Sequence, residues 1–296
     1  MSPELRNRVG VALVLVPLVV LINFALPTTL FALLIGVFVV LGAWEWPPLV
    51  GVDDRAARLR YAGATAVLMM GIWPWMDEPT VLLSLALAAL AWWATNLAWV
   101  VRYQQGVPEP ASAGPGLKVV SGWLTLIPAW AGLVYLHGGL GAGSNGAADA
   151  TATGPGSVMM LLLLVWVADA GAYFAGRRFG EPRLASRVSP GKSVEGLVGG
   201  LAAIALLALA VKFTAGVTGT DPWPGSTIMF LGLCVLTGFV SVLGDLAESM
   251  LKRMAGVKDS SKLLASHGGV LDRIDSLTAA APVFAVGLFA LAAHAA

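Results

Sequence analysis

Apolar runs follow one another along most of the chain, and many approach the length of about 20 residues that a helix needs to cross a bilayer. Short polar or glycine-containing stretches separate them. The runs predict nine membrane helices, at residues 9–26, 29–44, 61–75, 81–101, 119–136, 158–175, 194–215, 226–246 and 277–293. The third and fifth runs are short or interrupted by Pro and Gly, so eight helices remain an alternative.

This pattern favours an all-α fold, a polytopic bundle of transmembrane helices. We divide the chain into an N-terminal region, residues 1–116, with about four helices, and a C-terminal region, residues 117–296, that carries a polar site. Composition agrees with a membrane protein, because 57% hydrophobic and 12% charged residues exclude an ordinary soluble domain. The net charge of +1 gives no indication of a nucleic-acid partner.

The basic residues are distributed unevenly among the segments that join the predicted helices. With nine helices and a cytoplasmic N-terminus, all 18 Lys and Arg residues except Lys212 fall on the cytoplasmic side. This arrangement satisfies the positive-inside rule and places the C-terminus outside. It predicts a multi-pass protein of the inner or plasma membrane whose main polar segments face the cytosol.

The longest polar run, residues 249–276, is where we expect the chemistry. It mixes basic and acidic side chains with a His-Gly-Gly turn at residues 267–269. Asp272 and Asp275 are three positions apart, so on a helix both carboxylates share one face, as two ligands of a hard cation would. Just upstream, a polar stripe at helical spacing comprises Asp245, Glu248, Ser249 and Lys252.

Carboxylates within or beside the predicted helices are candidates for function, because a charge in hydrocarbon is costly. In the sixth helix Asp169, Tyr173, Gly176 and Arg177 form a second polar stripe that emerges toward the cytosol. Glu45 lies between two tryptophans, and we favour the interpretation that its side chain reaches out to the membrane interface.

Residues 189–196, at the start of the seventh helix, combine a lysine, hydroxyls and a carboxylate in a turn that suits a phosphate. Gly191, Lys192 and Ser193 resemble the end of a P-loop. That motif requires an earlier glycine where this chain has Ser186, and we expect no strand before it. A divalent cation with oxygen ligands, surrounded by Lys and Arg, explains the polar segments better.

The polar run resembles the signature of the phosphatidate cytidylyltransferases, or CDP-diacylglycerol synthases. The matching positions are Ser249, Lys252, Arg253, Lys258, Asp259, His267, Gly268, Gly269, Asp272, Arg273 and Asp275. Ala265 departs from it, because the family usually has Pro or Gly there. The resemblance extends to the surroundings of Glu45, Asp169, Lys192 and Asp245, and so covers the chain from about the second predicted helix onward.

The resemblance implies an Mg²⁺-dependent reaction in which CTP and phosphatidate give CDP-diacylglycerol and pyrophosphate. It implies that Asp245, Asp272 and Asp275 hold the metal and are catalytic together with Lys252 and Arg273. A second metal or a monovalent cation is left open. The implied substrate-binding residues are Asp169, Tyr173, Ser189, Lys192, Glu248, Ser249, Arg253, Lys258, Asp259, His267, Gly268 and Gly269.

Several alternatives stay open at this point. A transporter would spread its charges near the membrane midplane, and a CTP-dependent lipid kinase would transfer a different phosphate. A CDP-alcohol phosphotransferase would need an aspartate pattern that this chain lacks. His267 could equally support the turn or contact substrate. Gly196 and Gly200 form a small-residue pair that allows close helix contact, within one chain or in a homodimer among the membrane lipids.

Overall fold

The computed structural model describes residues 15–76, 78–107, 114–138, 154–264 and 268–295. In this part of the chain, a helix forms in each of the nine segments expected from the apolar runs. A short apolar helix, Leu15–Ala25, comes first. The others are α2 (Thr28–Leu49), α3 (Arg55–Ile72, followed by the 3-10 turn Trp73–Trp75), α4 (Pro79–Gln104), α5 (Pro115–Gly138), α6 (Pro155–Phe179), α7 (Val194–Thr218), α8 (Thr227–Met254) and α9 (Leu271–Ala295).

Seven of these helices, α2 and α4 to α9, are long and apolar enough to cross a membrane. The helix α3 is 18 residues long but carries three arginines in its first two turns, Arg55, Arg58 and Arg60. The first apolar helix is described only over Leu15–Ala25, and the rest of the predicted span 9–26 lies mostly outside the described residues. The fold is thus a polytopic helical bundle, while nine crossings and the sidedness of the termini stay predictions.

One element departs from the all-α expectation. A short antiparallel hairpin, β1 (Arg183–Ala185) and β2 (Ser189–Ser193), joins α6 to α7, with Arg183 opposite Ser193. The expectation of no strand beside Gly191-Lys192-Ser193 was therefore wrong, because these residues form the end of β2. The strand leads directly into α7, where the Ser193 side chain accepts a hydrogen bond from the Gly196 amide and caps the helix.

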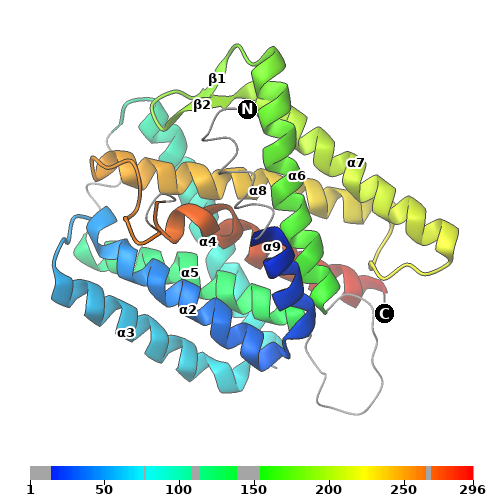
Figure 1. Ribbon diagram of the computed structural model, residues 1–296, viewed down its shortest axis with the longest axis horizontal. Helices are drawn as coiled ribbons and strands as arrows, with labels where there is room; N and C mark the ends of the chain where they lie inside the picture. The colour runs from blue at the N-terminus through cyan, green and yellow to red at the C-terminus, as the bar shows by residue number, and fades with distance from the viewer. Residues whose placement is uncertain (1–14, 77, 108–113, 139–153, 265–267, 296) are drawn as a thin grey trace.

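The helices pack around α8 and α9, which lie against each other (Figure 1). The pair α6 and α7 covers one side of them, and α5 packs on α9 and on α2, which in turn packs on α3. Fully buried side chains such as Phe230 of α8 and Phe284 of α9 fill the space between these layers. This arrangement brings α2, from the N-terminal region, next to the start of α9.

Glycines allow α6 and α7 to approach closely. A Cβ added at Gly200 would lie 2.7 Å from the Ala168 carbonyl oxygen, and one at Gly196 would lie 3.1 Å from the Ala172 carbonyl oxygen. The small-residue pair noticed in the sequence thus serves a contact within the chain.

Replacing Gly199 with Ala is expected to destabilise the protein by about 1–3 kcal/mol through overpacking. Its Cβ would lie 2.2 Å from the Ala175 Cβ, in a contact where neither helix has free space. Thermal unfolding in detergent should therefore show a lower midpoint for Gly199→Ala. Gly216→Ala, on the same helix but with no atom within 4 Å of the added Cβ, is the control and should unfold at the wild-type midpoint or slightly above it, because alanine favours a helix over glycine.

Candidate active site

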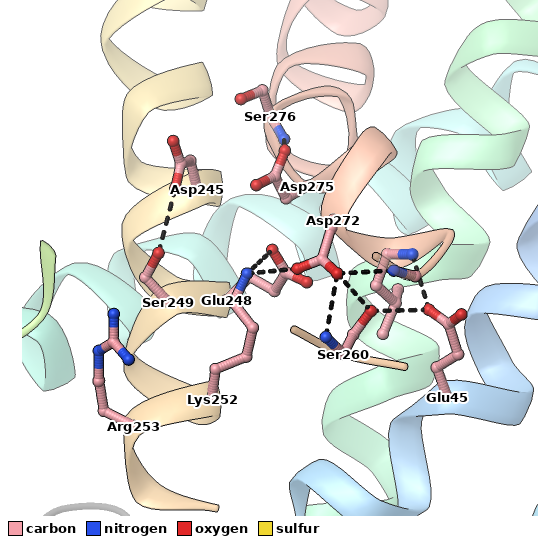
Figure 2. A network of polar contacts seen from close by, with 12 residues as sticks. Glu45, Asp245, Glu248, Ser249, Lys252, Arg253, Ser260, Asp272, Asp275 and Ser276 are labelled. Carbon is pink, nitrogen blue, oxygen red and sulfur yellow. Dashed lines mark hydrogen bonds and ion pairs between the residues drawn. The ribbon is translucent and has the colours of Figure 1, made fainter. Parts of the chain in front are cut away.

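The last turns of α8 present the polar stripe expected from the sequence. The Ser249 hydroxyl donates to Asp245 Oδ1 at 3.2 Å, and Lys252 Nζ lies 3.1 Å from Glu248 Oε2. Glu248 is buried and Lys252 is partly buried. Helical spacing therefore gathers these four side chains on the face of α8 that meets α9 (Figure 2).

Asp272, in the first turn of α9, joins this stripe to the segment between the two helices. Its Oδ1 lies 2.5 Å from Lys252 Nζ. Its Oδ2 accepts hydrogen bonds from the Ser260 amide at 3.0 Å, the Ser260 hydroxyl at 3.1 Å and the Gly269 amide at 2.8 Å. Both oxygens thus make contacts, and Lys252 is held between Glu248 and Asp272.

The three aspartates expected to share a metal are arranged differently from one another. Asp245 and Asp275 extend from α8 and α9 into the same space, whereas Asp272 turns toward Lys252 and Ser260 (Figure 2). Among the described residues, no three Asp, Glu, His or Cys side chains are grouped to hold a metal ion. A site built on Asp245 and Asp275 alone still suits Mg²⁺, which commonly uses one or two carboxylates together with substrate phosphates.

A buried atom beside this pair supports the fit of a cation or a water. Within the described residues, Glu248 Oε1 is buried and makes no hydrogen bond of standard geometry, and the same is true of Trp93 Nε1. Both residues line a small cavity of about 20 Å³, together with Asp275. Buried polar atoms are nearly always paired in folded proteins. Glu248 and Asp275 also interact directly, so two carboxylates meet here and a cation beside them would offset their charge.

The stripe of α6 and the start of α7 line a larger cavity of about 370 Å³. Asp169, Tyr173, Arg177, Lys192 and Ser193 are among its walls, so the sequence-predicted residues of both segments meet there. Lys192 Nζ lies 2.6 Å from Asp245 Oδ2. This ion pair connects the cavity to the carboxylates between α8 and α9.

The remaining candidate residues lie around this centre. Arg253 is exposed, and its Nε donates to the Val188 carbonyl of the hairpin at 3.3 Å. Lys258, Asp259 and Arg273 are also exposed, and Ser189 is half-buried in β2. His267 lies outside the described residues.

The two positions after His267 require glycine for different structural reasons. Gly268 adopts a positive φ of 77°, which strongly favours glycine. A Cβ on Gly269 would lie 2.0 Å from the Ser260 hydroxyl oxygen and 2.6 Å from Glu45 Oε2. The turn therefore needs glycine at both positions to place the Gly269 amide on Asp272.

Glu45 corrects the expectation that it reaches the membrane interface. Its exposed fraction is 0%, and its carboxylate faces inward, onto the segment before α9 (Figure 2). Ser260 and Ser261, which sequence reasoning did not select, donate their hydroxyls to it. The cost of a carboxylate at the end of an apolar helix was the available signal, and the neighbouring tryptophans led to the wrong interpretation.

Comparison with known proteins shows the family of the chain. The model of the Cytidylyltransferase family matches residues 6–291, and the chain belongs to that family. A phosphatidate cytidylyltransferase of Pseudomonas aeruginosa is 44% identical over 286 residues, 97% of each chain. One from Haemophilus influenzae is 39% identical over 96% of this chain and 99% of its own. One from Thermotoga maritima is 38% identical over 133 residues, 44% of this chain and 48% of its own.

Proposed function

We propose that the protein transfers the cytidylyl group of CTP to phosphatidate, giving CDP-diacylglycerol and pyrophosphate in phospholipid biosynthesis. The observation that carries the proposal is the set of ion pairs that Lys192 and Lys252 make with Asp245, Glu248 and Asp272 where β2, α8 and α9 meet, in a family of cytidylyltransferases. Relatives that match along almost their whole length bear the corresponding name. Phosphate groups and a lysine-rich site are chemically matched.

In the proposed reaction, an oxygen of the phosphatidate phosphate attacks the α-phosphorus of CTP. The bond between the α-phosphorus and the bridging oxygen breaks, and pyrophosphate leaves with both electrons. The nucleophile is already an anion, so no general base is required. Catalysis then consists of in-line positioning and of balancing the negative charge, which is the task proposed for Lys252, Arg253, Lys258 and Arg273.

Two parts of the site are proposed to handle different ligands. The cavity beside Lys192, with Tyr173 and Arg177, would hold the nucleotide or the lipid headgroup, with Ser189 at its edge. Asp245 and Asp275 would hold Mg²⁺, which supplies Lewis-acid neutralisation of phosphate charge when bound. Asp272 instead holds Lys252 in place, which differs from the metal role that the resemblance implied.

The apolar helices support a site at the membrane. With seven helices long and apolar enough to cross a bilayer in the described part of the chain, the protein can take its lipid substrate from the bilayer and a soluble nucleotide from one aqueous side. We propose that this side is the cytosol and that the membrane is the inner or plasma membrane, as the distribution of Lys and Arg indicates.

The test is a transfer assay on purified protein in detergent, with phosphatidate, Mg²⁺ and CTP labelled separately at the α- and γ-phosphorus. The proposal expects the α-label in lipid and the γ-label in pyrophosphate, with transfer abolished by EDTA and restored by Mg²⁺. Entry of the γ-label into lipid would identify a kinase. If neither label enters lipid, flux measurements in liposomes without nucleotide would test a transporter next.

A further inference from the structure

The buried carboxylate of Glu45 contacts the signature segment at four points. Its Oε1 accepts from the Ser261 hydroxyl at 2.5 Å and the Val270 amide at 2.9 Å. Its Oε2 accepts from the Ser260 hydroxyl at 2.9 Å and the Leu271 amide at 2.8 Å. Two bonds on each oxygen use the full acceptor capacity of a carboxylate.

The four donors are neutral, and two of them belong to the beginning of α9. Leu271 is the first residue of that helix, and its amide and that of Val270 point at the carboxylate. The N-terminus of a helix stabilises a negative charge, since its first amides lack partners within the helix. Glu45 therefore fixes where α9 starts, and so where Asp272 and Asp275 lie on it.

Ser260 connects Glu45 with the catalytic cluster. Its hydroxyl oxygen lies 2.9 Å from Glu45 Oε2 and 3.1 Å from Asp272 Oδ2, and its amide donates to the same Asp272 oxygen. Asp272 in turn holds Lys252. A continuous chain of polar contacts thus runs from α2 to the ammonium of Lys252 (Figure 2).

We propose that Glu45 is a positioning residue of the cytidylyl transfer, which holds residues 260–261 and 268–272 so that Asp272 keeps Lys252 directed at the phosphates; this inference rests on the proposed function. Glu45 lies 215 to 226 residues away in sequence from its four partners. The N-terminal region, through α2, therefore takes a direct part in forming the active site.

The chemistry of the contacts predicts which substitutions work. Gln at position 45 offers one acceptor oxygen and one NH₂ group to a site with four donors. Its NH₂ group must therefore face the Val270 or the Leu271 amide, which is also a donor. Asp keeps the charge and both acceptors on a chain shorter by one CH₂ group, so it retains part of the contact. We expect Glu45→Gln to lower kcat by about 100-fold and Glu45→Asp by about tenfold, because misplacement of about 1 Å has effects of this size.

Two readouts separate positioning from general stability. The first is kcat and KM for CTP, measured far below the thermal midpoint and normalised to folded protein. The second is amide hydrogen exchange, in which the Val270 and Leu271 amides should exchange faster in Glu45→Gln while α6 and α7 stay protected. Glu78→Gln, at the exposed start of α4, is the matched control and should keep wild-type values in both.

The outcomes are distinct. Slower turnover with faster exchange confined to residues 258–272, and partial rescue by Asp, supports the proposal. Wild-type kcat and unchanged exchange in Glu45→Gln overturn it, as does a loss of activity that follows only the loss of folded protein. If wild-type protein transfers no cytidylyl group, the proposed function fails, whereas the exchange experiment still decides whether Glu45 holds the segment.

A milder variant keeps the test possible if Glu45→Gln does not fold. Ser261→Ala removes one donor to Glu45 and leaves Ser260 and Asp272 unchanged. We expect a folded protein with kcat lowered by about three- to tenfold, as for the loss of one ordinary hydrogen bond, because three of the four donors to Glu45 remain. An unchanged kcat in this variant, together with unchanged exchange at Val270, would count against the proposal.

Discussion

Asp272→Asn is expected to lower turnover by about 100- to 1,000-fold, the range seen when one preorganised electrostatic group is removed from an active site. The side chain accepts from Lys252 on one oxygen and from Ser260 and Gly269 on the other. An amide has one acceptor atom, so an NH₂ group must face either the Lys252 ammonium or the three donors of the turn. Lys252 then loses its fixed position, and hydrophobic length is unchanged, so the protein should still insert.

The measurement is the rate of α-label transfer into lipid at saturating CTP, phosphatidate and Mg²⁺. Asp53→Asn is the matched control, because this carboxylate is 78% exposed and its ion pair with Arg58 lies outside the site. It should keep the wild-type rate, since exposed ion pairs contribute little. Retained activity in Asp272→Asn at saturating Mg²⁺ would contradict the proposed role.

Gly269→Ala is expected to have the second large effect. The added methyl group would lie 2.0 Å from the Ser260 hydroxyl oxygen and 2.6 and 2.8 Å from the two Glu45 oxygens. It would push the turn away from Glu45 and remove the Gly269 amide from Asp272. Overpacking of this kind costs about 1–3 kcal/mol, and we expect turnover to fall by about 100-fold because the displaced groups support Lys252.

Thermal unfolding and turnover should be measured together for this variant. Gly232→Ala on α8 is the control, because no atom lies within 4 Å of its added Cβ. Alanine favours a helix over glycine by about 1 kcal/mol, so this control should be as stable as the wild type or slightly more stable. Equal midpoints and equal rates for the two variants would show that the turn tolerates a methyl group at residue 269, and would contradict the close approach of Gly269 to Ser260 and Glu45.

The apolar runs predicted the positions of the helices well and their ends less well. The eighth run was expected to stop at residue 246, yet α8 continues to Met254, because the last turns are amphipathic and not uniformly apolar. In the same way α9 begins at Leu271, six residues before the predicted start, since hydropathy cannot recognise opening turns that contain Asp272 and Asp275. Most of the groups proposed to be catalytic, among them Lys252, Asp272 and Asp275, lie in these polar extensions.

Helical spacing predicted which side chains share a face but could not predict their partners. The stripe of Asp245, Glu248, Ser249 and Lys252 forms as expected. The direction of Asp272, away from Asp245 and onto Lys252, depends on the turn that Gly268 and Gly269 allow. The contacts of Glu45 with residues at least 215 positions away arise because α2 packs against the bundle. A local sequence pattern holds no information about that packing.

The ion pair between Lys192 and Asp245 has a consequence for how the site would fill. A phosphate bound at the Lys192 ammonium and a cation bound at the Asp245 carboxylate would both compete with the 2.6 Å contact between these two groups. Under the proposed function, a phosphate that draws the ammonium away frees a carboxylate for a cation, and a cation on Asp245 frees the ammonium for a phosphate. Nucleotide and metal would then increase each other's affinity by the same factor, as thermodynamic linkage requires.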